Sequence, residues 1–283
     1  MTGRHQDPKR KLRAGLYTVP SLHASLVCRQ SYVCLLGETE ITEVWANHFG
    51  QLYNSVTDDS ARAGFFERMK AHTFSNTHYD ISVSDIFIEL RNQTQSKAVG
   101  ADGIEMEAFI SCGIGLSVHI CFLFRLPIGY MPAACMASVI VPLAKCKSDD
   151  LSDINNYRAT ALSTTISKLF ESVISHFLDS KDAYDAHQFE FKRGHTTSLC
   201  TSSLKRTVDY YSDRGSPDVF SCFIDFTKAF DKVNYCILFN KLLDDHTDRS
   251  TVRTLAYWYS HQELCIRRHN TLSKWFTMGN GTI

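Results

Sequence analysis

The chain has 283 residues, of which 44% are hydrophobic and 21% charged, with 14 Gly and 6 Pro. This length suits about two domains at roughly 150 residues each, and the composition excludes a collagen-like, low-complexity or intrinsically disordered chain. Thirty Lys and Arg balance thirty Asp and Glu, so a polyanionic partner has to be bound by local basic clusters rather than by net charge.

The amino-terminal residues and the cysteines favour a reducing compartment. The first fifteen residues are basic and contain no apolar core of a secretory leader. Ten cysteines lie scattered along the chain without a C-x-x-C pair. We therefore expect reduced, buried cysteines in a cytoplasmic or nuclear protein. The Arg and Lys residues between positions 4 and 13 are typical of a solvated tail.

Two uncharged stretches, Ala108–Phe124 and Leu126–Ala144, are each nearly long enough to span a bilayer. Arg125 separates them, and three prolines interrupt the second stretch. This pattern favours a buried helix followed by a turn and a strand over a transmembrane hairpin. No membrane partner is expected.

Helical periodicity marks several segments along the chain. Two of these segments have residues that favour the start of a helix: Ser82 or Ser84 near the start of Asp80–Leu90, and Thr164 or Thr165 just before Ser167–Asp179. The predicted helices are Glu38–Val56, Asp80–Leu90, Ser167–Asp179 and Ser198–Tyr211.

A turn-rich segment, SKAVGADGI (Ser96–Ile104), lies between predicted helices. Its two glycines and Asp102 fit either a phosphate loop or a rigid surface loop. The segment lacks the G-x-x-x-x-G-K-[ST] order and a preceding strand, which favours the surface loop.

Two segments have the composition of strands. Met136–Leu143 is rich in β-branched residues and leads into a basic, polar loop. Five of the six residues of Val219–Ile224 are apolar or cysteine, which predicts a buried strand that ends at Asp225. A carboxylate in that position needs a cation or hydrogen-bond donors, and Mg²⁺ is one such cation. A purely structural aspartate is the common alternative.

Four segments in chain order together resemble a known enzyme family. They read SKAVGADGI, then IVPLAKCKSDDLSDINNYRATALSTTISKLFE, then HQFEFKRGHTT, then FIDFTKAFDKVN. This series is similar to the amino-terminal half of the reverse transcriptases of non-LTR (LINE-type, Jockey-like) retrotransposons, and the resemblance runs from about Trp45 to Ile283. It implies a right-hand fold with fingers and palm. It also implies RNA-templated DNA synthesis by two-metal nucleotidyl transfer, with Mg²⁺ (Mn²⁺ is an alternative), an RNA template, a DNA primer and deoxynucleoside triphosphates.

The resemblance also implies roles for individual residues. Asp225 matches the first palm aspartate that binds the catalytic Mg²⁺. Phe230 matches the aromatic residue that abuts the sugar and excludes a 2′-hydroxyl, although a plain core residue is the alternative. Arg158 resembles the arginine that pairs with the triphosphate, with Lys145 as a further charge nearby. Contacts to template or primer are implied for Gln188, Phe189 and Arg193.

The chain departs from the family pattern in ways that indicate a degenerate or divergent copy. Ala-Thr-Ala follows Arg158 where the family has Pro-Ile-Ser, and Glu190 replaces an expected glycine. Asp231 is a poor second metal ligand, because six residues put it about 120° around a helix, or roughly 20 Å along a strand, from Asp225. The other acidic pairs, 58–59, 149–150 and 244–245, do not lie between apolar strands, and residues 275–283 resemble the start of the next palm motif.

We therefore expect an α/β, helix-rich chain that comprises polymerase fingers and an incomplete palm, with the second acidic motif beyond Ile283. The predicted parts are a basic, irregular arm (1–40), a helical region (41–135), fingers (136–215) and a partial palm (216–283). Such a chain is predicted to lack polymerase activity of its own. The alternative is a non-catalytic RNA- or DNA-binding remnant of a mobile element, and the sequence does not indicate an oligomeric state.

Overall fold

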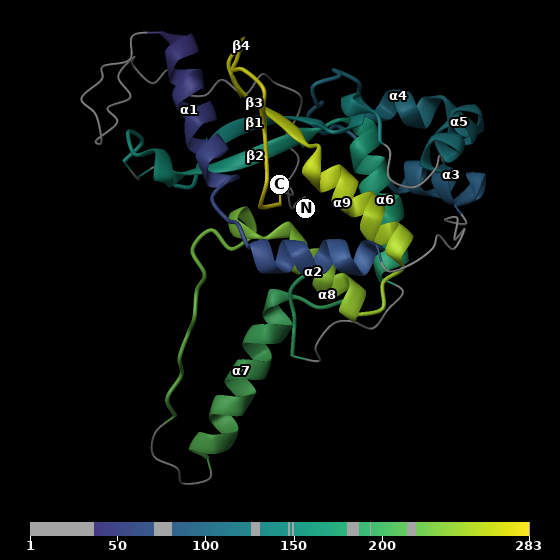
Figure 1. Cartoon of the computed structure of the whole chain (residues 1–283). Coiled ribbons are helices and arrows are strands. Elements are labelled where there is room, and N and C mark those ends of the chain that lie inside the picture. The colour runs from purple at the N-terminus through teal and green to yellow at the C-terminus, as the bar shows by residue number, and fades with distance from the viewer. Residues whose placement is uncertain are drawn as a thin grey trace, which may run out of the picture. The chain divides into compact units, whose positions relative to one another are not determined.

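The computed structural model describes residues 37–70, 81–125, 131–146, 148, 150–179, 187–192, 194–213 and 219–282. Contacts divide the chain into two compact units: a first unit of residues 1–176 and 229–283, and a second unit of residues 177–228. Across the described ranges, helices combine with one mixed sheet (Figure 1), in agreement with the expected helix-rich α/β class.

Most of the helices belong to the first unit, and local signals explain where they start. Ser82 and Asp85 form a reciprocal capping box at α3, in which the Ser82 hydroxyl accepts from the Asp85 N–H at 3.1 Å. Thr164 caps the first turn of α6 by accepting from the Ser167 N–H at 3.4 Å. The α-helices are α1 (Glu38–Leu52), α2 (Asp59–Lys70), α3 (Val83–Asn92), α4 (Met106–Ser111), α5 (Gly113–Arg125), α6 (Thr165–Asp179), α7 (Thr197–Ser212), α8 (Tyr235–Asp244) and α9 (Arg249–Ser260). The helices predicted at α1, α3, α6 and α7 are thus confirmed.

The sheet of the first unit is built around one central strand. Its order is β2-β1-β3-β4, with β5 also paired to β3. The β1–β2 pair is antiparallel and the β1–β3 pair parallel, and Ile140 in β1 is fully buried. The strands are β1 (Ala137–Ala144), β2 (Tyr157–Ser163), β3 (Glu263–Arg268), β4 (Thr271–Leu272) and β5 (Phe276–Thr277). The strand predicted at Met136–Leu143 is confirmed, and its position between two strands explains its continuous apolar run.

Aromatic side chains join the helices of the first unit to each other and to the sheet. Trp45 of α1 is 2% exposed, and its ring lies 4.7 Å from that of Tyr157 in β2. Phe170 places α6 between two other helices, with ring centroids 5.0 Å from Phe124 in α5 and 4.9 Å from Trp258 in α9. Edge-to-face pairs of this kind add to the apolar area that the rings bury.

The two uncharged stretches form separate elements. Ala108–Phe124 is divided between α4 and α5 by Gly113, which has a positive φ of 61°. The second stretch contains β1, and its residues 126–130 lie outside the described residues. Within the described ranges, no helix has both the length and the apolar character needed to cross a membrane.

The prediction for the cysteines is only partly correct. Those in the described ranges form no disulfide, and Cys121, Cys135 and Cys265 are buried as expected. In contrast, Cys222 and three others are exposed. Burial raises the pKa of the Cys135 thiol to about 11, which keeps this group protonated at neutral pH.

The prediction of a buried strand at Val219–Ile224 is wrong. Residues 219–226 are extended but unpaired, and no backbone hydrogen bond joins them to another described residue. Their apolar side chains are exposed, with Phe220 at 94% and Phe223 at 82%. An apolar run forms a strand only where a neighbouring strand satisfies its N–H and C=O groups, and no described strand does so for residues 219–226.

Candidate functional site

Arg158 projects from the exposed end of the β1–β2 pair. It lies opposite Leu143 in the antiparallel register. The preceding residue, Tyr157, contacts Trp45 of α1, and because side chains alternate along a strand, Arg158 faces the other side of the sheet. The Arg158 side chain is exposed and makes no hydrogen bond or ion pair with any described residue. Its guanidinium therefore has its donors available for a ligand.

Lys145 lies at the same end of this strand pair, directly after β1. Its backbone N–H donates to the Asn156 carbonyl at 2.8 Å, and its ammonium donates to the Asn155 carbonyl at 2.7 Å. The side chain is exposed. The structure thus brings two of the predicted phosphate-binding residues, Lys145 and Arg158, to one end of the sheet.

Phe230 starts a short 3₁₀ turn (Phe230–Lys232) that the carboxyl-terminal segment holds in place. The Phe230 carbonyl accepts from the Thr282 N–H at 3.0 Å, and the Asn280 amide donates to the Asp231 carbonyl at 2.8 Å. A Cβ at Gly281 would lie 2.5 Å from that same carbonyl, so the two segments are in close contact. The Phe230 side chain is 57% exposed, which does not support the core interpretation; its contact with a sugar stays a prediction.

Sequence reasoning missed the residue that organises this turn. Asn280 is fully buried, and besides its bond to Asp231 it donates to the Leu52 carbonyl at 3.2 Å and accepts from the Val56 N–H at 3.0 Å. It connects the end of α1 with the 3₁₀ turn. The available signal was the Asn-Gly pair at 280–281, a typical turn sequence.

Asp225 belongs to the second unit and lies in the unpaired segment, where it is exposed. Asp231, in contrast, belongs to the first turn of the 3₁₀ helix in the first unit. No group of three or more His, Cys, Asp or Glu within the described ranges is placed to hold a metal ion. A two-metal centre needs carboxylates from different strands, and a single carboxylate does not fit it. The geometry therefore supports no catalytic step at Asp225.

The other acidic pairs lie at helix ends or in loops. Asp59 begins α2, and Asp244 ends α8. Asp150 is exposed in the loop after β1. None of these three residues lies in a strand, which agrees with the expectation from the sequence.

The residues expected to contact template or primer belong to the second unit. The Gln188 amide donates to the Glu190 carbonyl at 3.2 Å, and the Phe189 ring lies 5.8 Å from that of His195. Arg193 lies outside the described residues. The backbone of Phe191 has a φ of 60°, a conformation that is unusual for a bulky side chain. A nucleic-acid contact for this turn stays a prediction.

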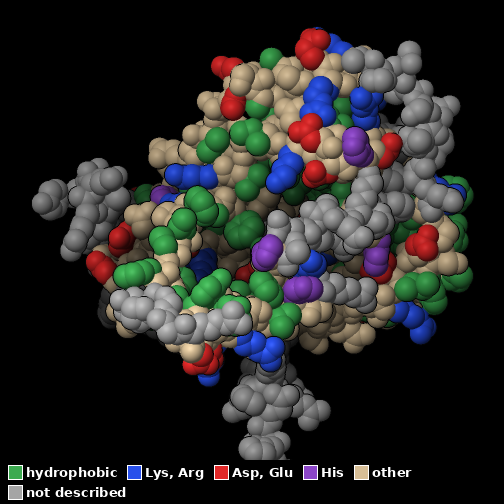
Figure 2. Space-filling view, turned by 90° about the horizontal axis from the view of Figure 1, so that it is seen from below, with side chains coloured by type: hydrophobic (Ala, Val, Ile, Leu, Met, Phe, Trp, Pro, Cys, Tyr) green, Lys and Arg blue, Asp and Glu red, His purple; other side chains and the backbone are tan. Residues whose placement is uncertain are grey.

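Charge on the visible surface is mixed. In the space-filling view of Figure 2, Lys and Arg side chains alternate with Asp and Glu, and several hydrophobic side chains gather between them. This distribution matches the equal numbers of basic and acidic residues in the chain. Binding of a polyanion would therefore depend on particular side chains such as Arg158 rather than on a continuous basic surface.

The comparison with known proteins points to one class of enzyme. The chain is 25% identical over 205 residues to the RNA-directed DNA polymerase from mobile element jockey of Drosophila funebris. The match covers 69% of this chain but only 22% of that polymerase, so the chain spans less than a quarter of its relative. No protein-family model matches the chain. The match supports a distant relationship to the reverse transcriptases, as the sequence resemblance predicts.

Proposed function

We propose that the chain is the fingers and partial palm of an RNA-directed DNA polymerase of the non-LTR retrotransposon type. The observation that carries this proposal is the 205-residue match to the jockey polymerase. The four ordered sequence segments and the exposed position of Arg158 support it. In this proposal the partners are an RNA template, a DNA primer and deoxynucleoside triphosphates.

The basic residues at the end of β1–β2 bind the triphosphate in this proposal. The planar guanidinium of Arg158 suits bidentate phosphate contacts, and Lys145 adds a point charge. Because Arg158 has no partner among the described residues, phosphate binding breaks no ion pair that the structure shows. Phe230 would contact the sugar, while Gln188, Phe189 and Arg193 would contact template or primer.

Because nucleotidyl transfer by two metal ions needs more than one carboxylate, we propose that these 283 residues do not catalyse DNA synthesis on their own. Mg²⁺, when bound, would neutralise charge on the phosphates, and Asp225 is the proposed ligand. Asp225 belongs to no group of three or more His, Cys, Asp or Glu residues placed to hold a metal within the described ranges, and no acidic pair of the sequence lies between two apolar strands. The alternative function is a non-catalytic RNA- or DNA-binding protein, which the exposed guanidinium of Arg158, without a partner among the described residues, also favours.

Primer extension on homopolymer RNA with Mg²⁺ or Mn²⁺ tests the catalytic proposal. The expected result is no incorporation by the chain as it stands. Incorporation that disappears in Asp225→Ala would overturn the inactivity and would establish Asp225 as a catalytic residue.

Salt-dependent RNA binding separates the polymerase-derived proposal from a protein without nucleic-acid contacts. Fluorescence anisotropy with a labelled RNA should show affinity that falls steeply with salt, since phosphate contacts release counterions. In the alternative RNA-binding function, Arg158→Gln should lower the slope of log affinity against log salt by about one. In the polymerase proposal, where Arg158 binds the triphosphate, the same variant should leave RNA binding unchanged. Arg249→Gln, at an exposed position at the start of α9, is the matched control and should leave the slope unchanged. A flat response in the unaltered chain contradicts both proposed functions.

A further inference from the structure

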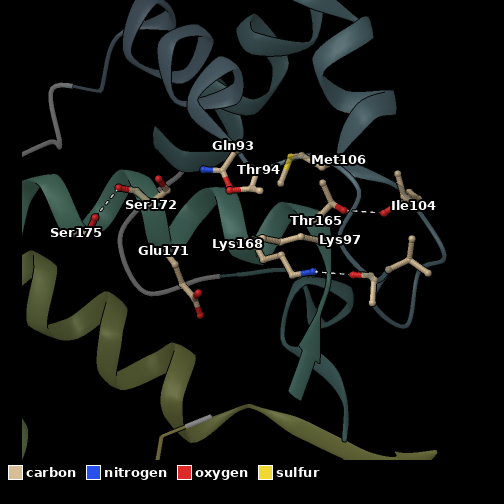
Figure 3. A pocket seen from close by; sticks show the side chains of 12 residues that line it. Gln93, Thr94, Lys97, Ile104, Met106, Thr165, Lys168, Glu171, Ser172 and Ser175 are labelled. Carbon is tan, nitrogen blue, oxygen red and sulfur yellow. Dashed lines mark hydrogen bonds between the residues drawn. The ribbon is translucent and has the colours of Figure 1, made fainter. Parts of the chain in front are cut away.

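A cavity of about 460 Å³ lies between the end of α3, the segment SKAVGADGI (Ser96–Ile104, hereafter the SKAVGADGI loop) and α6 (Figure 3). Its volume falls in the range of small-molecule sites. All of the lining residues, from Gln93 to Ser175, belong to the first unit. The cavity contains none of the residues assigned above to the triphosphate, the sugar or the metal.

The walls of the cavity are held by specific contacts between the SKAVGADGI loop and α6. The Thr165 hydroxyl donates to the Ile104 carbonyl at 2.7 Å, and the Lys168 ammonium donates to the Ala98 carbonyl at 3.2 Å (Figure 3). Gly100 lies directly against β2, where an added Cβ would be only 2.5 Å from the Ser163 carbonyl. The loop is therefore fixed at both ends and in its middle, so the site is formed before a ligand enters.

The charged groups of the lining favour an anion. Lys97 and Lys168 both line the cavity. Burial lowers the pKa of Lys168, the negative charges of Asp102 and Glu171 oppose that shift, and the positive charge of Lys97 lowers the pKa further. Two like charges near one cavity repel each other, and a bound anion relieves that repulsion. Glu171 also belongs to the lining; its carboxylate is directed away from the Lys168 ammonium (Figure 3), but its negative charge offsets part of the positive charge of Lys168.

Neutral and apolar groups complete the lining. The Gln93 amide and the Thr94 hydroxyl form no side-chain hydrogen bond to any described residue. Val99, Ile104 and Met106 supply an apolar wall. The cavity therefore offers cations and neutral donors for a multiply charged oxyanion, and its apolar wall suits an attached sugar or base.

We propose that this cavity binds the phosphate group of a nucleotide, with Lys97 and Lys168 as its cationic contacts and Gln93 and Thr94 as neutral donors. Free nucleotides and nucleotides within a single strand both supply this chemistry. The site is separate from Arg158, and it stands whether or not the chain derives from a polymerase.

Calorimetric titration of the full chain tests the site, with inorganic phosphate, AMP and a uridine octanucleotide as separate probes. Lys97→Met should weaken binding about tenfold, because it removes one charge-assisted contact. This variant should fold normally, because the Lys97 ammonium has no hydrogen-bond partner among the described residues. Glu171→Gln should strengthen binding about threefold by removing a negative charge. Lys241→Met, at an exposed position on α8, is the matched control and should leave the affinity unchanged.

The probes distinguish the source of the phosphate. AMP binding that Lys97→Met weakens supports a free nucleotide, and octanucleotide binding with the same sensitivity supports a strand. Equal affinity in the unaltered chain and in Lys97→Met overturns the proposal, as does the absence of saturable binding of every probe up to about 10 mM. Circular dichroism of each variant confirms that the fold is retained. A negative result leaves the polymerase proposal untouched, because that proposal uses no residue of this cavity.

Discussion

Two apolar segments of similar composition differ in burial and in strand pairing. Strand β1 lies between β2 and β3, and its Ile140 is completely buried. The segment 219–226 is also extended and apolar, yet no strand of the described part of the chain pairs with it, and Ile224 is 79% exposed. The difference shows that apolar composition selects an extended conformation, while neighbouring strands decide whether that conformation becomes part of a sheet.

Matched isoleucine substitutions test this contrast most strongly. Ile140→Ala should lower the free energy of unfolding by about 3–4 kcal/mol, because it leaves a cavity in a closely packed core. Ile224→Ala should change it by less than about 0.5 kcal/mol, since the side chain is exposed. Urea denaturation followed by circular dichroism measures both values. Equal losses would mean that residues 219–226 are covered in solution.

A second pair of substitutions compares polar groups in the two units. Asn280→Ala should cost about 2 kcal/mol, because it leaves buried backbone groups near Leu52 and Val56 without partners. Gln188→Ala, which removes a single exposed hydrogen bond, should cost less than about 0.5 kcal/mol. The same denaturation experiment measures both changes. A cost for Asn280→Ala as small as that of Gln188→Ala would contradict the organising role of Asn280.

The packed first unit should also lose stability in acid through a buried carboxylate. Glu89 accepts hydrogen bonds from Ser172 and from His176, the latter at 2.9 Å. Burial opposes ionisation, but these bonds outweigh it and hold the pKa of Glu89 below its ordinary value of 4.5. The unfolded chain therefore binds the proton first, and stability that is present above pH 4.5 is lost as the pH falls through the folded-state pKa.

Urea midpoints measured from pH 6 to pH 3 test this linkage. Glu89→Gln should flatten the acid limb of the curve, because it removes the titrating group. Ser172→Ala should flatten it partly by removing one of the bonds that lower the Glu89 pKa. An unchanged acid limb in Glu89→Gln would assign the loss of stability to other carboxylates.

The smallest expected effect concerns Phe230. Its ring is 57% exposed, so Phe230→Ala should cost less than about 1 kcal/mol, far below the cost of removing a core aromatic. Thermal unfolding measures this difference. In a chain completed with the palm and thumb of a relative, the same variant should accept ribonucleotides, and continued rejection would contradict the sugar contact.

Local sequence signals predicted much of the first unit. The caps at Ser82 and Thr164 and the helical spacing of α1 are decided within one or two turns, so they are visible in the sequence. The sequence also placed Lys145 and Arg158 in one motif that spans the β1–β2 connection, which explains why they lie at the same end of that strand pair; their phosphate contacts stay a prediction. The sequence did not predict the position of Asn280, nor that Lys97 and Lys168 line the same cavity, because each depends on contacts between distant segments.

The sequence by itself determined the helices α1, α3, α6 and α7, the central strand β1 and the distant relationship to reverse transcriptases, since periodicity, caps and ordered motifs are local properties of the chain. Only the tertiary structure decided that residues 219–226 pair with no described strand and that the SKAVGADGI loop borders a cavity with α6. The physical reason is the same in both cases. The hydrogen-bond partners of a strand and the walls of a cavity come from residues that are far apart along the chain.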